Sequence, residues 1–133
     1  MKKLTVMVVD DEPLVADTIL EILKEDGIDG YAFSSGQTAL NWFSRIKPDA
    51  VIMDVVMPGI NGIAAAIEIR KMSSDCRVIL FSGQSTTANL LNEARLQGHR
   101  FEVLEKPIKP EVLLEKLLSH NGSSKIESLT GDE

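Results

Sequence analysis

The sequence predicts an α/β fold, a doubly wound sheet of five parallel strands with helices on both faces. Two observations lead to this prediction. Short apolar segments alternate along the chain with stretches of helical length, an order that favours parallel strands joined by right-handed crossovers. The apolar segments are also nearly continuous, as at Met7–Val9 and Val51–Met53, which is typical of strands buried on both faces. We therefore expect the flavodoxin-like strand order 2-1-3-4-5.

Five apolar segments rich in β-branched or aromatic residues are predicted to form the strands. In chain order they are Leu4–Val9, Ile28–Phe33, Ala50–Met53, Val78–Phe81 and Phe101–Leu104. The last of these has the weakest strand pattern.

The first helix is predicted to begin at Pro13, because the first turn of a helix tolerates proline. Its apolar residues recur with helical spacing on one face, at Val15, Ile19, Ile22 and Leu23. Asp26-Gly27 ends it.

The other four helices are predicted from capping residues and helix breakers. Ser, Thr and Asn cap helix N-termini, whereas Gly and Pro interrupt the chain between elements. The second helix opens at Ser35-Gly36 and stops at Lys47-Pro48, and the third spans Ile63–Met72. The fourth spans Ala88–Leu96 after hydroxyls at Ser85–Thr87, and the fifth runs from Lys109-Pro110 to Leu118.

The length and composition indicate one globular domain. The chain has 133 residues, of which 44% are hydrophobic and 26% charged, enough for a single buried core. We expect the domain to cover residues 1–118. Residues 119–133 lack periodicity and are expected to form a flexible tail or linker.

The net charge, the cysteine content and the first apolar run indicate which partners and which cellular location to expect. A net charge of −6 argues against direct nucleic-acid binding, which needs clustered Lys and Arg. The single Cys76 cannot form an intramolecular disulfide. Asp10 and Asp11 interrupt the first apolar run before it could be a signal peptide or a membrane span. We therefore expect a soluble, cytoplasmic protein that binds no membrane.

Polar side chains follow the apolar runs of four predicted strands. They are Asp10–Glu12, Asp54, Ser82 and Lys106, and the carboxyl ends of parallel strands meet at one edge of the sheet, where ligands bind. Taken alone, Asp10–Glu12 is also typical of a helix N-terminus. Converging carboxylates repel one another unless a cation neutralises them, and oxygen ligands suit Mg²⁺. A Lys and a Ser beside them suit a phosphoryl group.

With these motifs the sequence resembles the receiver domain of two-component response regulators, over residues 4–118. The resemblance lies in several short motifs in a fixed order on a βα framework. They are Val8–Pro13, Asp54–Gly59 with Gly62, Leu80–Gly83 and Glu105–Pro107.

The resemblance implies a phosphorylation site that depends on Mg²⁺. Asp54 would accept the phosphoryl group as a carboxylate nucleophile. Asp11, with Asp10, Asp54 and the backbone carbonyl of Val56, would hold the metal.

The resemblance also implies roles for the residues around the acceptor. Lys106 would pair with Asp54 and later with a phosphate oxygen, while the Ser82 hydroxyl would move to bond the phosphate. Gly83 would leave room beside it. Pro107, preceded by a cis peptide, would aim Lys106.

One position departs from the family pattern, and two others bear on the expected lifetime of the phosphoryl group. Val103 stands where the family has an aromatic residue that rotates on activation. Phe101 should point to the same side of its strand and could substitute, although we favour core packing for it. Val56 and Gln84 occupy positions associated with phosphoryl lifetime; because Val56 cannot orient a water molecule, we expect slow self-dephosphorylation.

The predicted function is a switch with no substrate turnover of its own, phosphorylated by a sensor histidine kinase or phosphotransfer protein. Phosphorylation would alter the surface formed by the fourth helix, fifth strand and fifth helix, so that an output protein or a second copy of the chain could bind. Alternatively, the chain is the receiver fragment of a longer regulator. A Mg²⁺-dependent aspartyl-phosphate phosphatase of the haloacid-dehalogenase type is disfavoured, because Asp54–Val56 lacks its second Asp. A flavin-binding module is disfavoured because no phosphate-binding loop follows the first strand.

Overall fold

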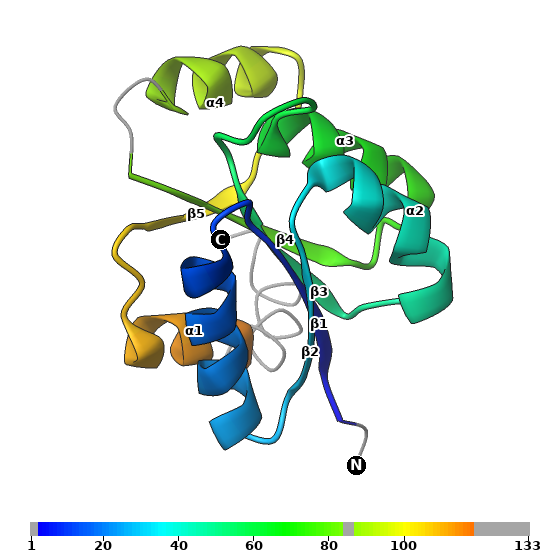
Figure 1. Cartoon of the computed structure of the whole chain (residues 1–133). Coiled ribbons are helices and arrows are strands. Elements are labelled where there is room, and N and C mark those ends of the chain that lie inside the picture. Colours follow the sequence, from blue (N-terminus) through cyan, green and yellow to red (C-terminus); the bar gives the residue numbers. More distant parts are fainter. Residues whose placement is uncertain (1–2, 84–86, 119–133) are drawn as a thin grey trace, which may run out of the picture.

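The computed structural model describes residues 3–83 and 87–118 (Figure 1). Five strands alternate with helices along the chain, as the sequence predicts. The strands are β1 (Thr5–Val9), β2 (Asp29–Phe33), β3 (Ala50–Asp54), β4 (Arg77–Ser82) and β5 (Glu102–Glu105). The helices are α1 (Pro13–Glu25), α2 (Gly36–Ile46), α3 (Gly62–Met72) and α4 (Thr87–Leu96), followed by a helix over residues 110–118.

The strands form one parallel sheet in the order β2-β1-β3-β4-β5, which confirms the predicted fold class. Helix α1 and the helix over 110–118 lie on one side of the sheet, and α2, α3 and α4 lie on the other (Figure 1). The strand order reverses between β1 and β3. In sheets of this kind, ligands bind at the point of reversal, at the carboxyl ends of the strands.

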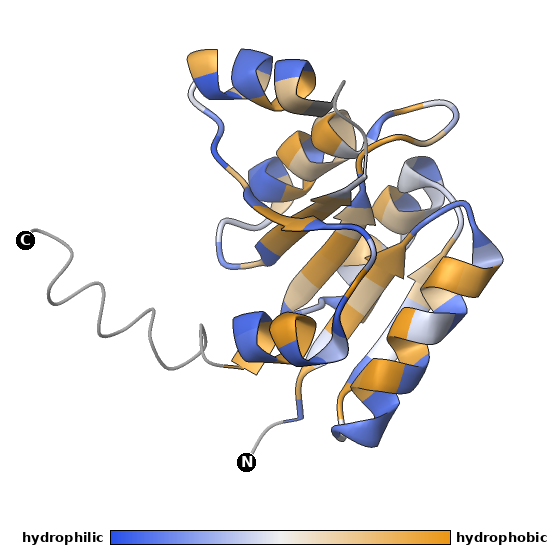
Figure 2. Cartoon of the chain, turned by 90° about the vertical axis from the view of Figure 1, so that its left-hand side faces the viewer, coloured by the Kyte–Doolittle hydropathy of each residue, from blue (hydrophilic) through white to orange (hydrophobic). Residues whose placement is uncertain are grey.

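Each face of the sheet has its own core. Successive residues of a strand point to opposite faces, and in β1 Val6 and Val8 pack beneath α1 while Met7 and Val9 pack beneath α2 and α3. All four are fully buried. Hydrophobic residues gather on the strands and the inward sides of the helices, and hydrophilic residues lie outside (Figure 2). Burial on both faces explains why the strand sequences are continuously apolar.

Capping side chains precede two of the helices, α2 and α3. Ser35 accepts a hydrogen bond from the Thr38 N–H at 3.1 Å, and Asn61 accepts one from the Ala64 N–H at 2.8 Å. The weakest strand prediction is displaced by one residue, since β5 begins at Glu102. Its pairing with β4 starts at Ile79 and Glu102, so Phe101 precedes the ladder. Predicted hydroxyl caps at Ser85 and Thr86, and the tail over 119–133, lie outside the described residues.

The loop after β3 is held against the strand by Gly62. Its N–H donates to the Val55 carbonyl at 2.9 Å, and a Cβ at this position would lie 2.0 Å from the Asp54 carbonyl oxygen. Only a residue without a side chain can approach this closely. Gly62 therefore fixes the path of the chain next to Asp54.

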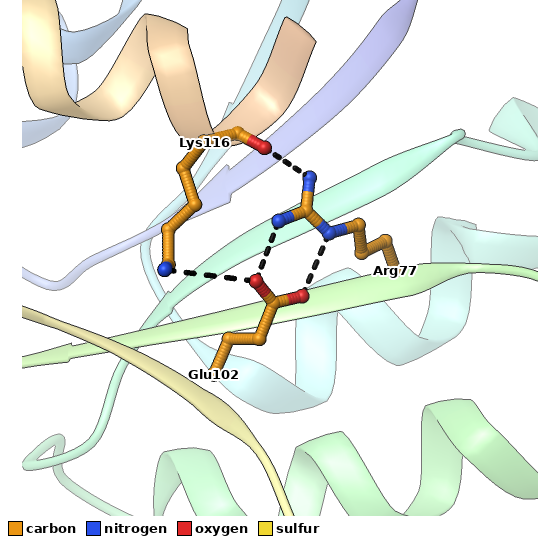
Figure 3. Close-up of polar contacts among 3 residues, drawn as sticks. All are labelled: Arg77, Glu102 and Lys116. Atoms are coloured by element: carbon orange, nitrogen blue, oxygen red, sulfur yellow. Dashed lines mark hydrogen bonds and ion pairs between the residues drawn. The ribbon is translucent and has the colours of Figure 1, made fainter. Parts of the chain in front are cut away.

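Three charged residues form a cluster at the edge of the sheet (Figure 3). Arg77 and Glu102 are the first residues of β4 and β5, so the cluster lies at the end opposite the carboxyl ends of the strands. The Arg77 guanidinium donates two hydrogen bonds to the Glu102 carboxylate and one to the Lys116 carbonyl. The Lys116 ammonium lies 3.8 Å from the same carboxylate. The cluster joins β4, β5 and the helix over 110–118.

Among residues 3–83 and 87–118, no helix has both the length and the apolar character needed to cross a membrane.

Candidate functional site

Three carboxylates meet at the carboxyl ends of β1 and β3. Asp10 and Asp11 follow β1, Asp54 is the last residue of β3, and these strands are neighbours in the sheet. One carboxylate oxygen from each residue lies within 4.8 Å of the others. Asp10 and Asp54 are buried, with 1% and 4% of their surfaces exposed, while Asp11 is open to solvent. The structure thus places side by side the acidic residues that the sequence predicts to converge.

The two carboxylate oxygens of Asp10 differ in their hydrogen bonding. Its Oδ1 accepts a hydrogen bond from the Glu12 N–H at 2.8 Å. Its Oδ2 is buried without a hydrogen-bond donor among the described residues, and the nearest cation is the Lys106 ammonium at 3.7 Å. A buried carboxylate oxygen without a donor is unfavourable unless a cation approaches it. The environment of Asp10 therefore suits a bound cation.

Lys106 reaches the acidic cluster from the residue after β5. Its Nζ lies 3.2 Å from Asp54 Oδ1 and 5.0 Å from the centroid of the buried Phe81 ring. The Lys106 N–H donates to the Ser82 carbonyl at 3.0 Å, which fixes the backbone from which the side chain extends. The Lys106–Pro107 peptide is cis, as the resemblance implies. Lys106 thus faces the Asp54 carboxylate directly.

The electrostatics of the cluster are dominated by burial. Burial raises the pKa of Asp54, and the Lys106 ammonium and the Val56 N–H, which donates to the carboxylate, oppose this rise. Burial also raises the pKa of Asp10, opposed first by the hydrogen bond from Glu12. One ammonium is not enough for three carboxylates, so an additional positive charge would stabilise their ionised forms.

The remaining residues singled out from the sequence surround this cluster. Ser82 is the last residue of β4 and is half-buried. A Cβ on Gly83 would lie 3.3 Å from the Lys106 Cβ, so a larger residue there would crowd the lysine. Val56 is 50% exposed and lies at the rim of the site, two residues after Asp54.

Val103 and Phe101 lie away from the carboxylates, under α4. Val103 is 37% exposed. Phe101 is partly buried against the core on the α2 and α3 face, and the Arg70 guanidinium stacks over its ring at 3.9 Å. This placement supports the core-packing interpretation of Phe101.

Two contacts were not predicted from the sequence, one beside the site and one away from it. Phe81 lies under Lys106 and Arg70 covers Phe101, yet both are ordinary members of a strand and a helix in the sequence. The hydrophobic periodicity of a sequence does not predict side-chain contacts between residues that are tens of positions apart. Only the structure reveals these contacts.

The comparisons with known proteins agree with this geometry. Residues 6–118 match the family model described as the response regulator receiver domain. The chain is 31% identical to the chemotaxis protein CheY of Thermotoga maritima, over 84% of this chain and 92% of that protein. It is 26% identical to the DNA-binding response regulator MtrA of Mycolicibacterium smegmatis, over 84% of this chain and 48% of that protein. The chain thus spans about half the length of that regulator.

Among solved structures, a response regulator receiver domain protein from Clostridium thermocellum superposes with a TM-score of 0.81 at 28% identity. The match covers 92% of this chain and 98% of that one. The fold comparison therefore agrees with the sequence comparison, because both relate this chain to receiver domains.

Proposed function

Because this chain belongs to the response regulator receiver domain family, we propose that it is a signalling switch that accepts a phosphoryl group on Asp54. The single observation that carries the proposal is the contact of 3.2 Å between Asp54 Oδ1 and the Lys106 ammonium, at the rim where two further carboxylates converge. A buried carboxylate facing a lysine in an acidic pocket is suited to nucleophilic attack on phosphorus.

We propose that Asp10, Asp11 and Asp54, with the backbone carbonyl of Val56, hold Mg²⁺. The residues fit this ion because three carboxylate oxygens lie within 4.8 Å of one another and Asp10 Oδ2 lacks a hydrogen-bond donor. When bound, Mg²⁺ neutralises charge on the phosphoryl oxygens.

In the proposed reaction, an Asp54 oxygen forms a bond to phosphorus while the N–P bond of a donor phosphohistidine breaks. The departing imidazole takes a proton from solvent. Lys106 moves from the Asp54 carboxylate to a phosphoryl oxygen, and the Ser82 hydroxyl donates to another. Gly83 leaves space for this movement beside Lys106.

The proposed donor is a sensor histidine kinase or a phosphotransfer protein in the cytoplasm. The proposed output surface consists of α4, β5 and the helix over 110–118, which an output protein or a second copy of the chain would read. The match to the DNA-binding response regulator MtrA covers only 48% of that protein, which supports the alternative that this chain is the receiver part of a longer regulator. The switch would have no turnover substrate of its own.

Intact-mass spectrometry after incubation with acetyl phosphate tests the acceptor chemistry. We expect one phosphate adduct with Mg²⁺, and none with EDTA or in Asp54→Asn. Asp75→Asn, which changes an exposed aspartate outside the cluster, is the matched control and should be modified like the wild type. If Asp54→Asn and the wild type gain the same adduct, Asp54 is not the acceptor.

A further inference from the structure

The two edges of the sheet differ in how well they are protected from pairing with another strand. An edge strand exposes unpaired backbone N–H and C=O groups, and charged side chains discourage a second strand from binding them. At one edge, β5 begins and ends with a glutamate, Glu102 and Glu105. At the other, β2 has one charged residue, Asp29, and continues with the uncharged residues Gly30–Phe33. The edge formed by β2 is therefore the less protected of the two.

The backbone of β2 bonds to β1 and its flanking residues through every second residue. The Asp29 N–H donates to the Leu4 carbonyl at 3.0 Å, and the Phe33 carbonyl accepts a hydrogen bond from the residue after β1. The two strands pair in parallel over their whole length, and alternate residues of such a ladder face the neighbouring strand. Gly30 and Ala32 therefore direct their N–H and C=O groups away from the sheet, where no other strand of the described residues pairs with them.

The side chains of β2 differ between the two sides of the sheet. Tyr31 is 47% exposed, and its partner in register, Met7, belongs to the core beneath α2 and α3, so the ring lies on that side. Gly30 lies beneath α1, because a Cβ there would come within 2.6 Å of Leu20 Cδ2. Ala32 points to the same side as Gly30. Small residues on one side and an exposed ring on the other leave room for a second strand.

We propose that two copies of the chain pair antiparallel through β2, with Tyr31 on the two-fold axis, and so form one continuous sheet. In this register Gly30 lies opposite Ala32 of the second copy, and the outward groups of both residues exchange N–H···O=C bonds. The two Tyr31 rings meet as a cross-strand aromatic pair. Asp29 lies opposite Phe33 of the second copy, so no like charges face each other. The interface is isologous and gives a closed dimer.

The charges on α1 favour a second copy of this chain as the occupant of the edge. Asp17 and Lys24 lie three residues before and four residues after Leu20, so they share the face of α1 that lies next to Gly30. Both are exposed. Because the two-fold axis reverses the direction of α1, Asp17 of each copy faces Lys24 of the other. These attractions offset part of the repulsion between two chains that each carry a net charge of −6.

Sedimentation velocity of the full chain over a range of concentrations tests the inference. We expect a reversible dimer. Tyr31→Lys places like charges on the axis, and Ala32→Pro removes an outward N–H that the fold of one copy does not use. Each should raise the dissociation constant of the dimer by about tenfold or more. The inference does not rest on the proposed function, so Asp54→Asn should dimerise like the wild type.

Leu96→Lys is the matched control. It adds a lysine at a leucine of α4 that is 79% exposed, far from β2 in the strand order, and should dimerise like the wild type. A wild type that stays monomeric at all concentrations overturns the proposal. So does a dimer that Leu96→Lys abolishes and Tyr31→Lys leaves intact, because the second copy would then bind the proposed output surface instead.

Reversal of the α1 charges tests the antiparallel arrangement. Asp17→Lys alone should weaken the dimer by about threefold, and the addition of Lys24→Asp should restore the wild-type dissociation constant. Both substitutions alter only exposed side chains, so they remain informative even if Ala32→Pro misfolds. If the double variant dimerises no better than Asp17→Lys, the two residues do not face each other and the arrangement is wrong.

Disulfide cross-linking of Tyr31→Cys tests the register. Residues opposite each other at a non-hydrogen-bonded position have Cα atoms about 4.5 Å apart, a separation that a disulfide can span. With copper phenanthroline as oxidant, two thiols lose two electrons and two protons and form one S–S bond. We expect covalent dimers of Tyr31→Cys, and none of the wild type, whose single Cys76 is buried. Ser44→Cys, at an exposed position of α2, is the control, and equal cross-linking of the two variants would overturn the register.

Discussion

At the scale of single residues, Asp10 and Asp54 carry their carboxylates into a part of the protein that water hardly reaches. Burial raises the pKa of both groups, so the folded protein favours their protonated forms more than the unfolded chain does. The stability they contribute is therefore present below the ordinary carboxyl pKa of 3.8 and is lost as the pH rises through their raised values. At neutral pH without metal, both ionised groups oppose folding.

Replacing one of these carboxylates should therefore stabilise the metal-free protein. In EDTA at pH 7 we expect Asp10→Asn to melt higher by roughly 4 °C, equivalent to about 1 kcal/mol, the order of the cost of a buried polar atom without a partner. Mg²⁺ should raise the melting temperature of the wild type and not that of the variant. Thermal melts followed by circular dichroism, with Asp75→Asn as control, measure this. A variant that melts lower than the wild type in EDTA contradicts the electrostatic argument.

Phe81 is expected to position Lys106. The ring lies 5.0 Å from the ammonium, and a cation–π contact of this kind contributes about 0.5–2 kcal/mol. We therefore expect Phe81→Leu to slow phosphorylation by acetyl phosphate by about two- to tenfold, with Mg²⁺ affinity unchanged, measured by intact mass over time. Phe43→Leu changes a buried ring in the opposite core and should lower stability without slowing the reaction. Equal slowing in both variants would show that Phe81 acts only through packing.

We expect Val56 to affect how long the phosphoryl group lasts on Asp54. Its side chain is 50% exposed beside Asp54 and, being apolar, it cannot hydrogen-bond an attacking water molecule. We expect the phosphorylated protein to lose its adduct slowly and Val56→Asn to lose it faster, both followed by intact mass after removal of the donor. A lifetime of seconds in Mg²⁺ buffer for the wild type would refute this expectation.

At the scale of elements, the turn between β3 and α3 depends on one glycine. A Cβ on Gly62 would overlap the Asp54 carbonyl oxygen, so Gly62→Ala must displace the strand end that carries Asp54. We expect a loss of about 2 kcal/mol or more in unfolding free energy, together with slower phosphorylation, measured by denaturant unfolding and intact mass.

Gly98→Ala is the matched control for this prediction. Gly98 has a positive φ of 96°, and a Cβ there would meet nothing within 4 Å. Its replacement should cost about 1–2 kcal/mol through backbone strain alone and leave phosphorylation unchanged. If Gly62→Ala is no worse than Gly98→Ala, the close approach to Asp54 does not constrain the turn.

The elements themselves could be predicted well from the sequence. The order β2-β1-β3-β4-β5 follows from alternating strands and helices, because parallel strands require crossovers and the right-handed rule leaves few arrangements. Prediction was weakest at β5, which has little apolar character, and its start was displaced from Phe101 to Glu102. Since β5 lies at the sheet edge, pairing with β4 decides its limits rather than its own pattern.

The candidate site could be predicted only in part. The proximity of Asp10, Asp54 and Lys106 follows from strand ends that share one edge. The ring under Lys106 and the hollow between α4 and β5 could not be foreseen, because they depend on how side chains from distant segments pack. The stacking of Arg70 on Phe101 is such a contact. The sequence around neither residue predicts it.

At the scale of the whole molecule, the reactive groups and the structural ion cluster occupy opposite ends of the sheet. Arg77, Glu102 and Lys116 join the beginnings of β4 and β5 to the helix over 110–118 (Figure 3). Ser82 and Lys106 lie at the other ends of the same two strands. A phosphoryl group on Asp54 would therefore act near the carboxyl ends of β4 and β5, two strands whose beginnings the ion cluster joins, next to the proposed output surface.

Borohydride trapping tests the central proposal most directly. The protein is incubated with acetyl phosphate and Mg²⁺, reduced with borohydride, digested and analysed by peptide mass spectrometry. Reduction converts an aspartyl phosphate to homoserine, so we expect homoserine at position 54 only, and none when Mg²⁺ is withheld. Homoserine at Asp10, Asp11 or another carboxylate, with residue 54 unchanged, would contradict the assignment of Asp54 as the phosphoryl acceptor.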